Sequence, residues 1–429
     1  MKTIRLLLCC MIFLACDTSQ NRSKKQVKPR NNASSFHNLE QRLDSLKNEA
    51  VMPGFGVVIV HSDSMIYTNG FGLADVEKQI PFTPKTIHVM ASVSKTFIGV
   101  ALVKLMELKG IALDTPINAL LPFEVHHPKF PESAITLRQL ANHTAGLRED
   151  FDPETVGESD VLLLENIEFE HDSIFEIVKS DMRYYKLGKP TSLKQNVFNF
   201  LHPEGKWYSE TNFRKVLPGT KYEYSNLNAD LAAYIIEYQS GMPFSEFTTK
   251  YIFEPLKMTQ TSWFYLPESE LPYSSLYRPD DWDKPTYAIK LPKFRYAGYS
   301  SGDLKSTLTD MSSYIKEILK GANGQGTLLT KEGYEILLSP QLNESHYLSS
   351  RDDNLLSDEY NSGIFWAVSP IGIRLHNGGS IGVFSFLYID PATNSGAFGF
   401  SNLSDAKFEF VRDYVFEAER NYHQRSRAK

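Results

Sequence analysis

Two kinds of apolar spacing divide the chain into predicted helices and strands. Apolar residues recur every three to four positions, which gives a helix one apolar face, over residues 37–49, 92–108, 137–142, 227–239 and 408–419. Gly110 follows the second of these segments and predicts its end. From there to about residue 320 the pattern predicts mostly helices and long loops.

Predicted strands occur only near the two ends of the chain. Residues 55–60 and 65–68 are short extended runs separated by a polar turn, which predicts a hairpin. Three more extended runs, bounded by Gly, Asn and Pro, occupy 372–376, 384–389 and 396–400. We therefore predict an α+β fold: one antiparallel sheet built from the N- and C-terminal strands, flanked by helices, with a mostly helical lobe inserted in the middle.

The N-terminus has the pattern of an export signal. Lys2 and Arg5 precede an apolar run over residues 6–14, which is far shorter than the ~20 residues of a membrane span. Such a signal predicts a protein exported to the periplasm or cell envelope.

Cys16 stands where a bacterial lipoprotein signal places its lipidated cysteine, although Phe13 occupies a position that usually holds Leu. We predict a lipoprotein-type signal over 1–16 and membrane attachment through Cys16, with ordinary signal cleavage as the alternative. Residues 17–35 are polar and predict a flexible tether.

Residues 36–421 form the predicted catalytic domain. Within it, residues 149–215 are rich in acidic and aromatic side chains without a clear period. We interpret this stretch as an insertion that forms part of the substrate cleft.

Composition excludes several classes of function. The 429 residues include 45 Lys and Arg against 51 Asp and Glu, a formal charge of −6, whereas a nucleic-acid surface needs clustered basic residues. The 3 cysteines all lie within the first 16 residues, which excludes a disulfide framework or a cysteine nucleophile in the rest of the chain. No phosphate loop, dinucleotide fingerprint or metal cage is present, so we expect no cofactor and no metal. His126 and His127 lack a further ligand at suitable spacing and are assigned to a surface loop.

Ser92-Val93-Ser94-Lys95 opens the predicted helix over 92–108. Ser92 and Lys95 are one turn apart and share a helix face, at an end where backbone N–H groups favour negative charge on oxygen. A serine hydroxyl becomes a good nucleophile only when a neighbouring base takes its proton. The alternative interpretation of this motif alone is a capping serine with a solvated lysine.

Two later segments carry further candidate residues. Tyr224-Ser225-Asn226 lies on a loop before a predicted helix, where Tyr224 could relay a proton and Asn226 could donate to a substrate amide. His376-Asn377-Gly378-Gly379 ends a predicted strand, and its glycines allow backbone N–H groups to approach an oxyanion closely. Taken alone, each segment also fits an ordinary buried tyrosine with an Asn cap, or a strand-ending turn.

Together, and in this order, the three segments resemble the motifs of the serine β-lactamase and penicillin-binding-protein superfamily. The resemblance is to the branch of class C β-lactamases, D-Ala-D-Ala carboxypeptidases, D-aminopeptidases and related esterases, and it covers roughly 53–390 apart from the insertion. Supporting stretches lie at 136–140, 143–147, 254–258, and at Ser306-Thr307 with Asp310.

The resemblance implies a serine hydrolase that forms an acyl-enzyme on Ser92. Lys95 and Tyr224 would share the proton transfer, and Asn226, His376 and Gly378 would bind the substrate, a small molecule or a peptide. The N–H groups of Ser92 and Gly379 would hold the oxyanion.

His376 stands where true β-lactamases carry lysine. Because histidine is mostly neutral at pH 7, this change predicts esterase, amidase or D-amino-acid peptidase activity in the cell envelope rather than efficient β-lactam turnover. The alternative is a non-catalytic module that binds a peptidoglycan or peptide ligand.

Ser300 and Ser380 both lie in Gly-x-Ser-x-Gly patterns, which are typical of α/β-hydrolases. That fold needs a buried strand before the serine and a histidine after it. Residues 290–295 are too polar for such a strand, and His423, the only histidine after Ser380, lies in a charged tail. We therefore reject both as nucleophiles.

Overall fold

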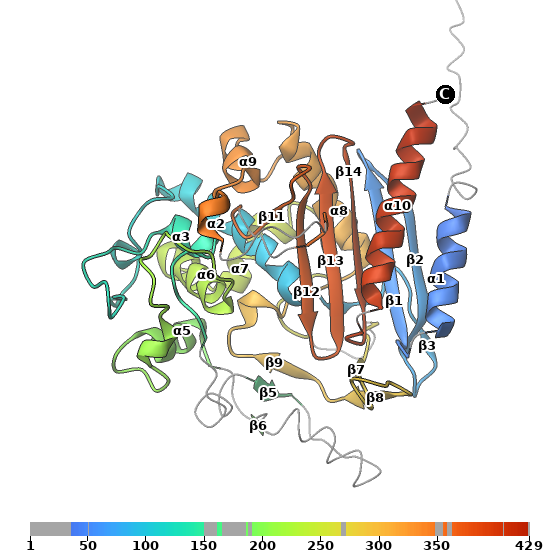
Figure 1. The fold of residues 1–429 in the computed structure, drawn as a ribbon, viewed down its shortest axis with the longest axis horizontal. Coiled ribbons are helices and arrows are strands. Elements are labelled where there is room, and N and C mark those ends of the chain that lie inside the picture. Colours follow the sequence, from blue (N-terminus) through green and yellow to red (C-terminus); the bar gives the residue numbers. More distant parts are fainter. Residues whose placement is uncertain are drawn as a thin grey trace, which may run out of the picture.

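Strands from the two ends of the chain lie side by side in one antiparallel sheet of the computed structural model (Figure 1). Among the described residues this sheet has 7 strands, in the order β11-β12-β13-β14-β1-β2-β3. They are β1 (Gly54–His61), β2 (Ser64–Asp75), β3 (Ile80–Pro81), β11 (Ala367–Val368), β12 (Arg374–Ser380), β13 (Val383–Asp390) and β14 (Ser395–Ser401). Because β1 pairs antiparallel with both β14 and β2, the predicted α+β fold is confirmed.

The structure describes residues 36–49, 51–149, 161–164, 186–187, 191–266, 272–347, 355–357, 363–405 and 407–427. The predicted signal with Cys16, the tether over 17–35 and much of the predicted insertion over 149–215 lie outside the described residues.

The central strand β1 is apolar on both of its sides. Val58 and Val60 belong to one hydrophobic core, whereas Phe55, Val57 and Ile59 belong to a second. Successive side chains of a strand point to opposite faces of the sheet, so each face of β1 contributes to one core. The unbroken apolar run therefore reflects a strand buried on both faces.

Helices cover both faces of the sheet (Figure 1). Helices α1 (His37–Glu49) and α10 (Phe408–Arg427) pack on one face, and α8 (Leu308–Ala322) packs on the other. The adjoining lobe contains α2 (Lys95–Lys109), α3 (Leu137–Ala141), α5 (Leu193–Leu201), α6 (Asn226–Ser240), α7 (Phe244–Thr248) and α9 (Lys331–Leu338). Gly110 ends α2 with a φ of 66°, the left-handed conformation that glycine adopts readily. Within the described part of the chain, each helix is too short or too polar to span a bilayer.

The prediction that strands occur only near the chain ends was wrong. Short strands also lie in the middle of the chain: β4 (His88–Val89) pairs with β10 (Lys305–Ser306), β7 (Leu276–Pro279) with β8 (Ala288–Leu291), and β9 (Phe294–Tyr296) with β5 (Val161–Leu163), which also pairs with β6 (Lys186–Leu187). Each has only a few residues, which is too short for the alternation that identifies a strand in a sequence.

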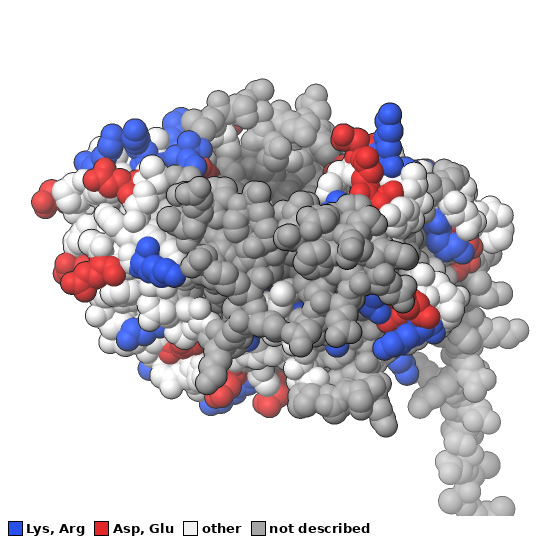
Figure 2. All heavy atoms as spheres, turned by 90° about the horizontal axis from the view of Figure 1, so that it is seen from below, with Lys and Arg blue, Asp and Glu red and all other residues white. Residues whose placement is uncertain are grey.

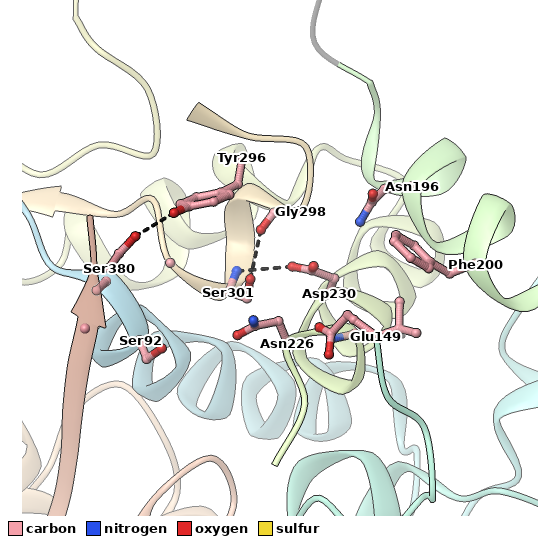
Figure 3. A pocket seen from close by; sticks show the side chains of 14 residues that line it. Ser92, Glu149, Asn196, Phe200, Asn226, Asp230, Tyr296, Gly298, Ser301 and Ser380 are labelled. Carbon is pink, nitrogen blue, oxygen red and sulfur yellow. Dashed lines mark hydrogen bonds between the residues drawn. The ribbon is translucent and has the colours of Figure 1, made fainter. Parts of the chain in front are cut away.

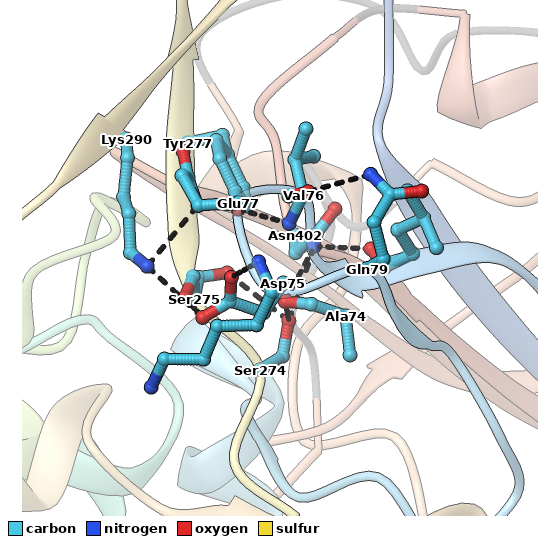
Figure 4. A network of polar contacts seen from close by, with 12 residues as sticks. Ala74, Asp75, Val76, Glu77, Gln79, Ser274, Ser275, Tyr277, Lys290 and Asn402 are labelled. Atoms are coloured by element: carbon cyan, nitrogen blue, oxygen red, sulfur yellow. Dashed lines mark hydrogen bonds and ion pairs between the residues drawn. The ribbon is translucent and has the colours of Figure 1, made fainter.

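A polar network fixes the β7–β8 hairpin to the end of β2 (Figure 4). The Nζ atom of Lys290 lies 2.9 Å from a carboxylate oxygen of Asp75 and 3.1 Å from one of Glu77. The hydroxyl of Tyr277 donates to Glu77 at 2.9 Å and accepts from the Val76 N–H at 2.7 Å. These contacts hold the segment that continues through β9 into the cleft.

Charged side chains of both signs are interspersed over the described surface on the face shown in Figure 2. Among the described residues, this face shows no large area in which all charged side chains have the same sign.

Glu419 belongs to α10, and its carboxyl group is buried. Its side chain accepts a hydrogen bond from the Ser395 hydroxyl of β14, and burial raises its pKa to about 7. An acid whose pKa is higher in the folded than in the unfolded protein binds more protons when folded. The free energy of unfolding should therefore fall as the pH rises from about 4.5 to about 7.

We expect Glu419→Gln to remove this pH dependence. The variant should match the wild type at pH 5 and exceed its free energy of unfolding at pH 8 by on the order of 3 kcal/mol at most, measured by urea denaturation at both values. Glu417→Gln changes an exposed residue of the same helix, which pairs with Arg42, and should keep the wild-type dependence on pH. If Glu419→Gln kept the wild-type difference in the free energy of unfolding between pH 5 and pH 8, Glu419 would not be the group that causes this pH dependence.

Candidate active site

Ser92 lies where the chain enters the helical lobe. The residues Ala91–Ser94 form a 3-10 turn, η2, and α2 begins only at Lys95, so the α-helix starts three residues later than predicted. Ala91 has a φ of 45°, a conformation that residues with a Cβ rarely adopt. Backbone strain of this kind concentrates at functional sites, and here it directly precedes a serine whose side chain lines the cleft in Figure 3.

Lys95 is completely buried beneath Ser92, with 0% of its surface exposed. Its Nζ atom donates hydrogen bonds to Ser92 Oγ at 3.1 Å, Asn226 Oδ1 at 2.7 Å and the Ser301 carbonyl at 2.7 Å. These three acceptors come from three separate segments, so they fix the amine in one position. The solvated lysine of the alternative interpretation is therefore wrong.

The segment Tyr224–Asn226 leads into α6. The Ser225 hydroxyl caps the helix by accepting from the Leu227 N–H, and Asn226 is its first residue. The Tyr224 ring lies above Lys95, with 5.0 Å between its centroid and Lys95 Nζ, and the residue is 37% exposed. The structure thus brings Tyr224 and Asn226 to the same lysine.

Strand β12 runs next to Ser92. A side chain at Gly378 would place its Cβ 2.7 Å from the Met90 carbonyl oxygen and 3.0 Å from the Ser92 nitrogen, so only glycine lets the strand approach this closely. Gly379 lines the cleft beside Ser92. His376 is fully buried and its ring lies 6.0 Å from that of Tyr224. Its Nδ1 atom carries a proton, because it lies 2.6 Å from the Asn377 carbonyl, which can only accept.

The cleft has an empty volume of about 700 Å³, including open solvent at its mouth. Figure 3 shows residues of the cleft wall, and Ser92 is among them. Asn196 and Phe200 from α5 also line it. Both residues fall within the stretch 149–215 that the sequence analysis interpreted as an insertion.

The sequence matches the family model described as beta-lactamase over residues 38–421. The chain belongs to the beta-lactamase family. It is similar to Protein flp of Staphylococcus aureus (strain COL), with 22% identity over 356 residues, which are 82% of this chain and 60% of that protein. The chain thus spans less than two thirds of the length of that curated relative.

Solved structures share the fold at low sequence identity. The octameric penicillin-binding protein homologue from Pyrococcus abyssi superposes with a TM-score of 0.68 at 20% identity, covering 89% of this chain and 76% of that one. The D-amino acid amidase from Ochrobactrum anthropi SV3, in complex with L-phenylalanine amide, gives a TM-score of 0.63 at 20% identity, covering 92% and 99%.

The two serines rejected as nucleophiles have other partners in this beta-lactamase-family fold. Ser300 is buried and donates to Asp230 Oδ1 at 2.6 Å. Ser380 lies at the end of β12, with its hydroxyl 2.5 Å from that of Tyr296. Neither contact supplies the histidine of a catalytic triad.

His143 was not predicted as a site residue. It is fully buried, adopts a φ of 57° and packs against Tyr224, with 4.7 Å between ring centroids and the two rings tilted by 32°. Its Nδ1 atom accepts from the Ser225 N–H at 3.3 Å. Burial, together with the charge of Lys95, holds its pKa well below the usual value, so it is a neutral support for the tyrosine loop. Its place in the stretch 143–147 was the only sequence signal.

Glu149 was also missed as a site residue. It lies at the N-terminus of α6, where one carboxylate oxygen accepts from the Leu227 N–H at 2.5 Å and the other from the Ser225 hydroxyl at 3.0 Å. Burial raises the pKa of this carboxyl group. No motif identified Glu149 as a site residue, because it reaches α6 only through tertiary packing.

The assignment of His127 to the protein surface was wrong. It was expected in a surface loop together with His126, but it is fully buried and its Nε2 atom lies 2.6 Å from the Arg214 carbonyl. His126 is exposed and lies 2.9 Å from Glu124. The apolar surroundings of His127 come from distant segments, which include Phe213.

Proposed function

We propose that this protein is a serine hydrolase that forms an acyl-enzyme on Ser92 and acts on ester, amide or D-amino-acid peptide bonds. The observation that carries the proposal is the buried amine of Lys95, 3.1 Å from Ser92 Oγ, at the base of a cleft large enough for a small substrate. A lysine needed only for packing would not hold its amine against a serine hydroxyl that lines a cleft.

The reaction follows from these positions. Ser92 Oγ attacks the substrate carbonyl carbon, and its proton passes to the pair formed by Lys95 and Tyr224. The Ser92 and Gly379 N–H groups donate to the oxyanion. The bond to the leaving group then breaks and that group takes up the proton. Water finally attacks the acyl ester and regenerates Ser92.

The test is turnover of three substrate types by the purified protein: a short-chain p-nitrophenyl ester, a D-Ala-D-Ala peptide and a penicillin. Ester hydrolysis that depends on Ser92, with little or no penicillin hydrolysis, supports the proposal. Release of D-alanine from the peptide would identify a carboxypeptidase. Binding of the peptide without turnover of any substrate would favour a non-catalytic binding module instead.

We further propose that the protein is an exported lipoprotein of the cell envelope, attached to the membrane through Cys16. The sequence pattern over 1–16 supports this proposal. The mature wild type should carry a mass increment for acyl chains and partition with membranes, and Cys16→Ala should lose both. A wild-type mass without acyl chains would indicate ordinary signal cleavage.

A further inference from the structure

A second, smaller cavity lies beside the cleft that contains Ser92. It has an empty volume of about 290 Å³, including open solvent, and it shares Tyr296, Gly302 and Ser380 with the lining of the cleft. Among the described lining residues, the two side chains common to both spaces are those of Tyr296 and Ser380, because Gly302 has none. These two side chains form a partition between the cleft and the second cavity.

The partition is closed by a hydrogen bond. The hydroxyl groups of Tyr296 and Ser380 lie 2.5 Å apart (Figure 3). The backbone of both residues is also held, since the Tyr296 N–H donates to Asp303 Oδ2 at 2.8 Å and the Ser380 carbonyl accepts from the Ser404 hydroxyl. The Tyr296 ring packs against that of Phe294, with 5.7 Å between their centroids. These contacts fix the ring in the position that separates the two spaces.

The second cavity is largely apolar. Its lining includes two charged residues, Asp303 and Lys305, and the Lys305 amine donates to the carbonyls of Asp303 and Trp263 at 2.8 and 3.3 Å. Apart from these two and the residues shared with the cleft, the described lining is Val89, Tyr265, Leu276, Phe294, Ile381 and Val383. A hydrocarbon group that entered this cavity would lose contact with water, which stabilises it there.

Strand β12 indicates how a substrate lies in the cleft. It runs from the His376 end, where the ring lies 6.0 Å from that of Tyr224, through Gly379 to Ser380. The leaving group takes up its proton on the side of Tyr224, so it lies toward His376. The acyl group is attached to the other side of the carbonyl carbon that Gly379 would hold. It therefore points toward Ser380 and Tyr296.

We propose that Tyr296 limits the length of the acyl group that the enzyme accepts, because its ring separates Ser92 from the second cavity. This role of Tyr296 rests on the proposed serine hydrolase function and adds a specificity-determining residue to it. A short acyl group fits between Gly379 and the partition, whereas a longer chain meets the ring. Without the ring the two spaces join, and the chain extends into the apolar cavity.

The test measures kcat/KM for the p-nitrophenyl esters of butyric, hexanoic and octanoic acid. The wild type should prefer butyrate. Tyr296→Ala should raise the ratio of octanoate to butyrate by about 10-fold or more, since each methylene group removed from water contributes about 4-fold. Tyr296→Phe keeps the ring and should keep the wild-type preference. Tyr287→Ala is the matched control, because that tyrosine is 48% exposed and is not in the described lining of either space.

Ile381→Phe, combined with Tyr296→Ala, tests whether the chain enters the second cavity. Ile381 lines that cavity and is not among the described residues of the cleft lining. A larger side chain there refills the cavity, so the ratio of octanoate to butyrate should fall back toward the wild-type value. A general loosening of the fold by Tyr296→Ala would not be reversed in this way. Thermal melting checks folding, and Tyr296→Leu repeats the test with a smaller change in volume and a smaller expected rise.

A wild type that prefers octanoate, an unchanged ratio in Tyr296→Ala, or a raised ratio that Ile381→Phe does not lower would overturn the inference. Binding of butyramide and octanamide to Ser92→Ala, measured by NMR titration with and without Tyr296→Ala, tests the partition without catalysis. A gain in relative affinity for octanamide on removal of the ring, in a protein that hydrolyses no ester, would refute only the hydrolase. The absence of this gain would refute the limit set by Tyr296.

Discussion

Ser92→Ala is expected to abolish covalent labelling by a fluorophosphonate and to lower kcat/KM for an ester substrate by about 10⁴-fold or more. The substitution removes the oxygen that forms the acyl-enzyme and leaves the fold intact, because Ser92 Oγ takes only one of the three hydrogen bonds of Lys95. Intact mass spectrometry after incubation with the probe measures the effect directly. The wild type should gain one adduct, and the variant none.

Ser380→Ala is the control for this experiment. Ser380 lines the same cleft, and its hydroxyl contacts Tyr296 rather than a lysine, so the variant should still be labelled. An adduct that persists in Ser92→Ala, or that maps to Ser380, would place the nucleophile elsewhere. Incubation with a penicillin in the same series shows whether a β-lactam can acylate Ser92.

The pairing of Ser92 with Lys95 could be predicted because it is local. Residues three positions apart lie on one side of a helical turn whether the turn is 3-10 or α, so the later start of α2 did not change their proximity. The end of α2 at Gly110 was equally predictable, since it depends on one glycine conformation. The apolar runs of the long strands were long enough to identify them.

Other residues that line the cleft could not be predicted, for the opposite reason. Glu149, Asn196 and Asp230 meet only after α5 and α6 pack together, and none belongs to a motif. A backbone acceptor such as the Ser301 carbonyl cannot be recognised in a sequence, because every residue carries a backbone carbonyl. The burial of His376 was also hidden, because the spacing of a strand does not say which of its faces meets the helical lobe.

Lys95→Met is expected to lower kcat by ~10²–10⁴-fold, the range for loss of a proton-transferring group. Methionine has nearly the same length but carries no proton, so Ser92 would lose the amine 3.1 Å from its oxygen. The Asn226 and Ser301 acceptors would each lose a donor, at a cost of about 1–3 kcal/mol apiece, which the removal of a buried charge partly offsets. Lys104→Met is the control on the same helix: its amine donates to the Leu328 carbonyl, away from the cleft, and activity should be unchanged.

Lys95→Arg separates proton transfer from charge alone. Guanidinium keeps a positive charge but does not release its proton in proteins, so the variant should remain as inactive as Lys95→Met if Lys95 carries the proton of Ser92. Single-turnover kinetics with an ester should show slow acylation in both variants, and circular dichroism checks that both are folded. Recovery of acylation in Lys95→Arg would mean that Lys95 acts only through its charge. The proton of Ser92 would then pass to Tyr224, whose ring lies 5.0 Å from the lysine amine.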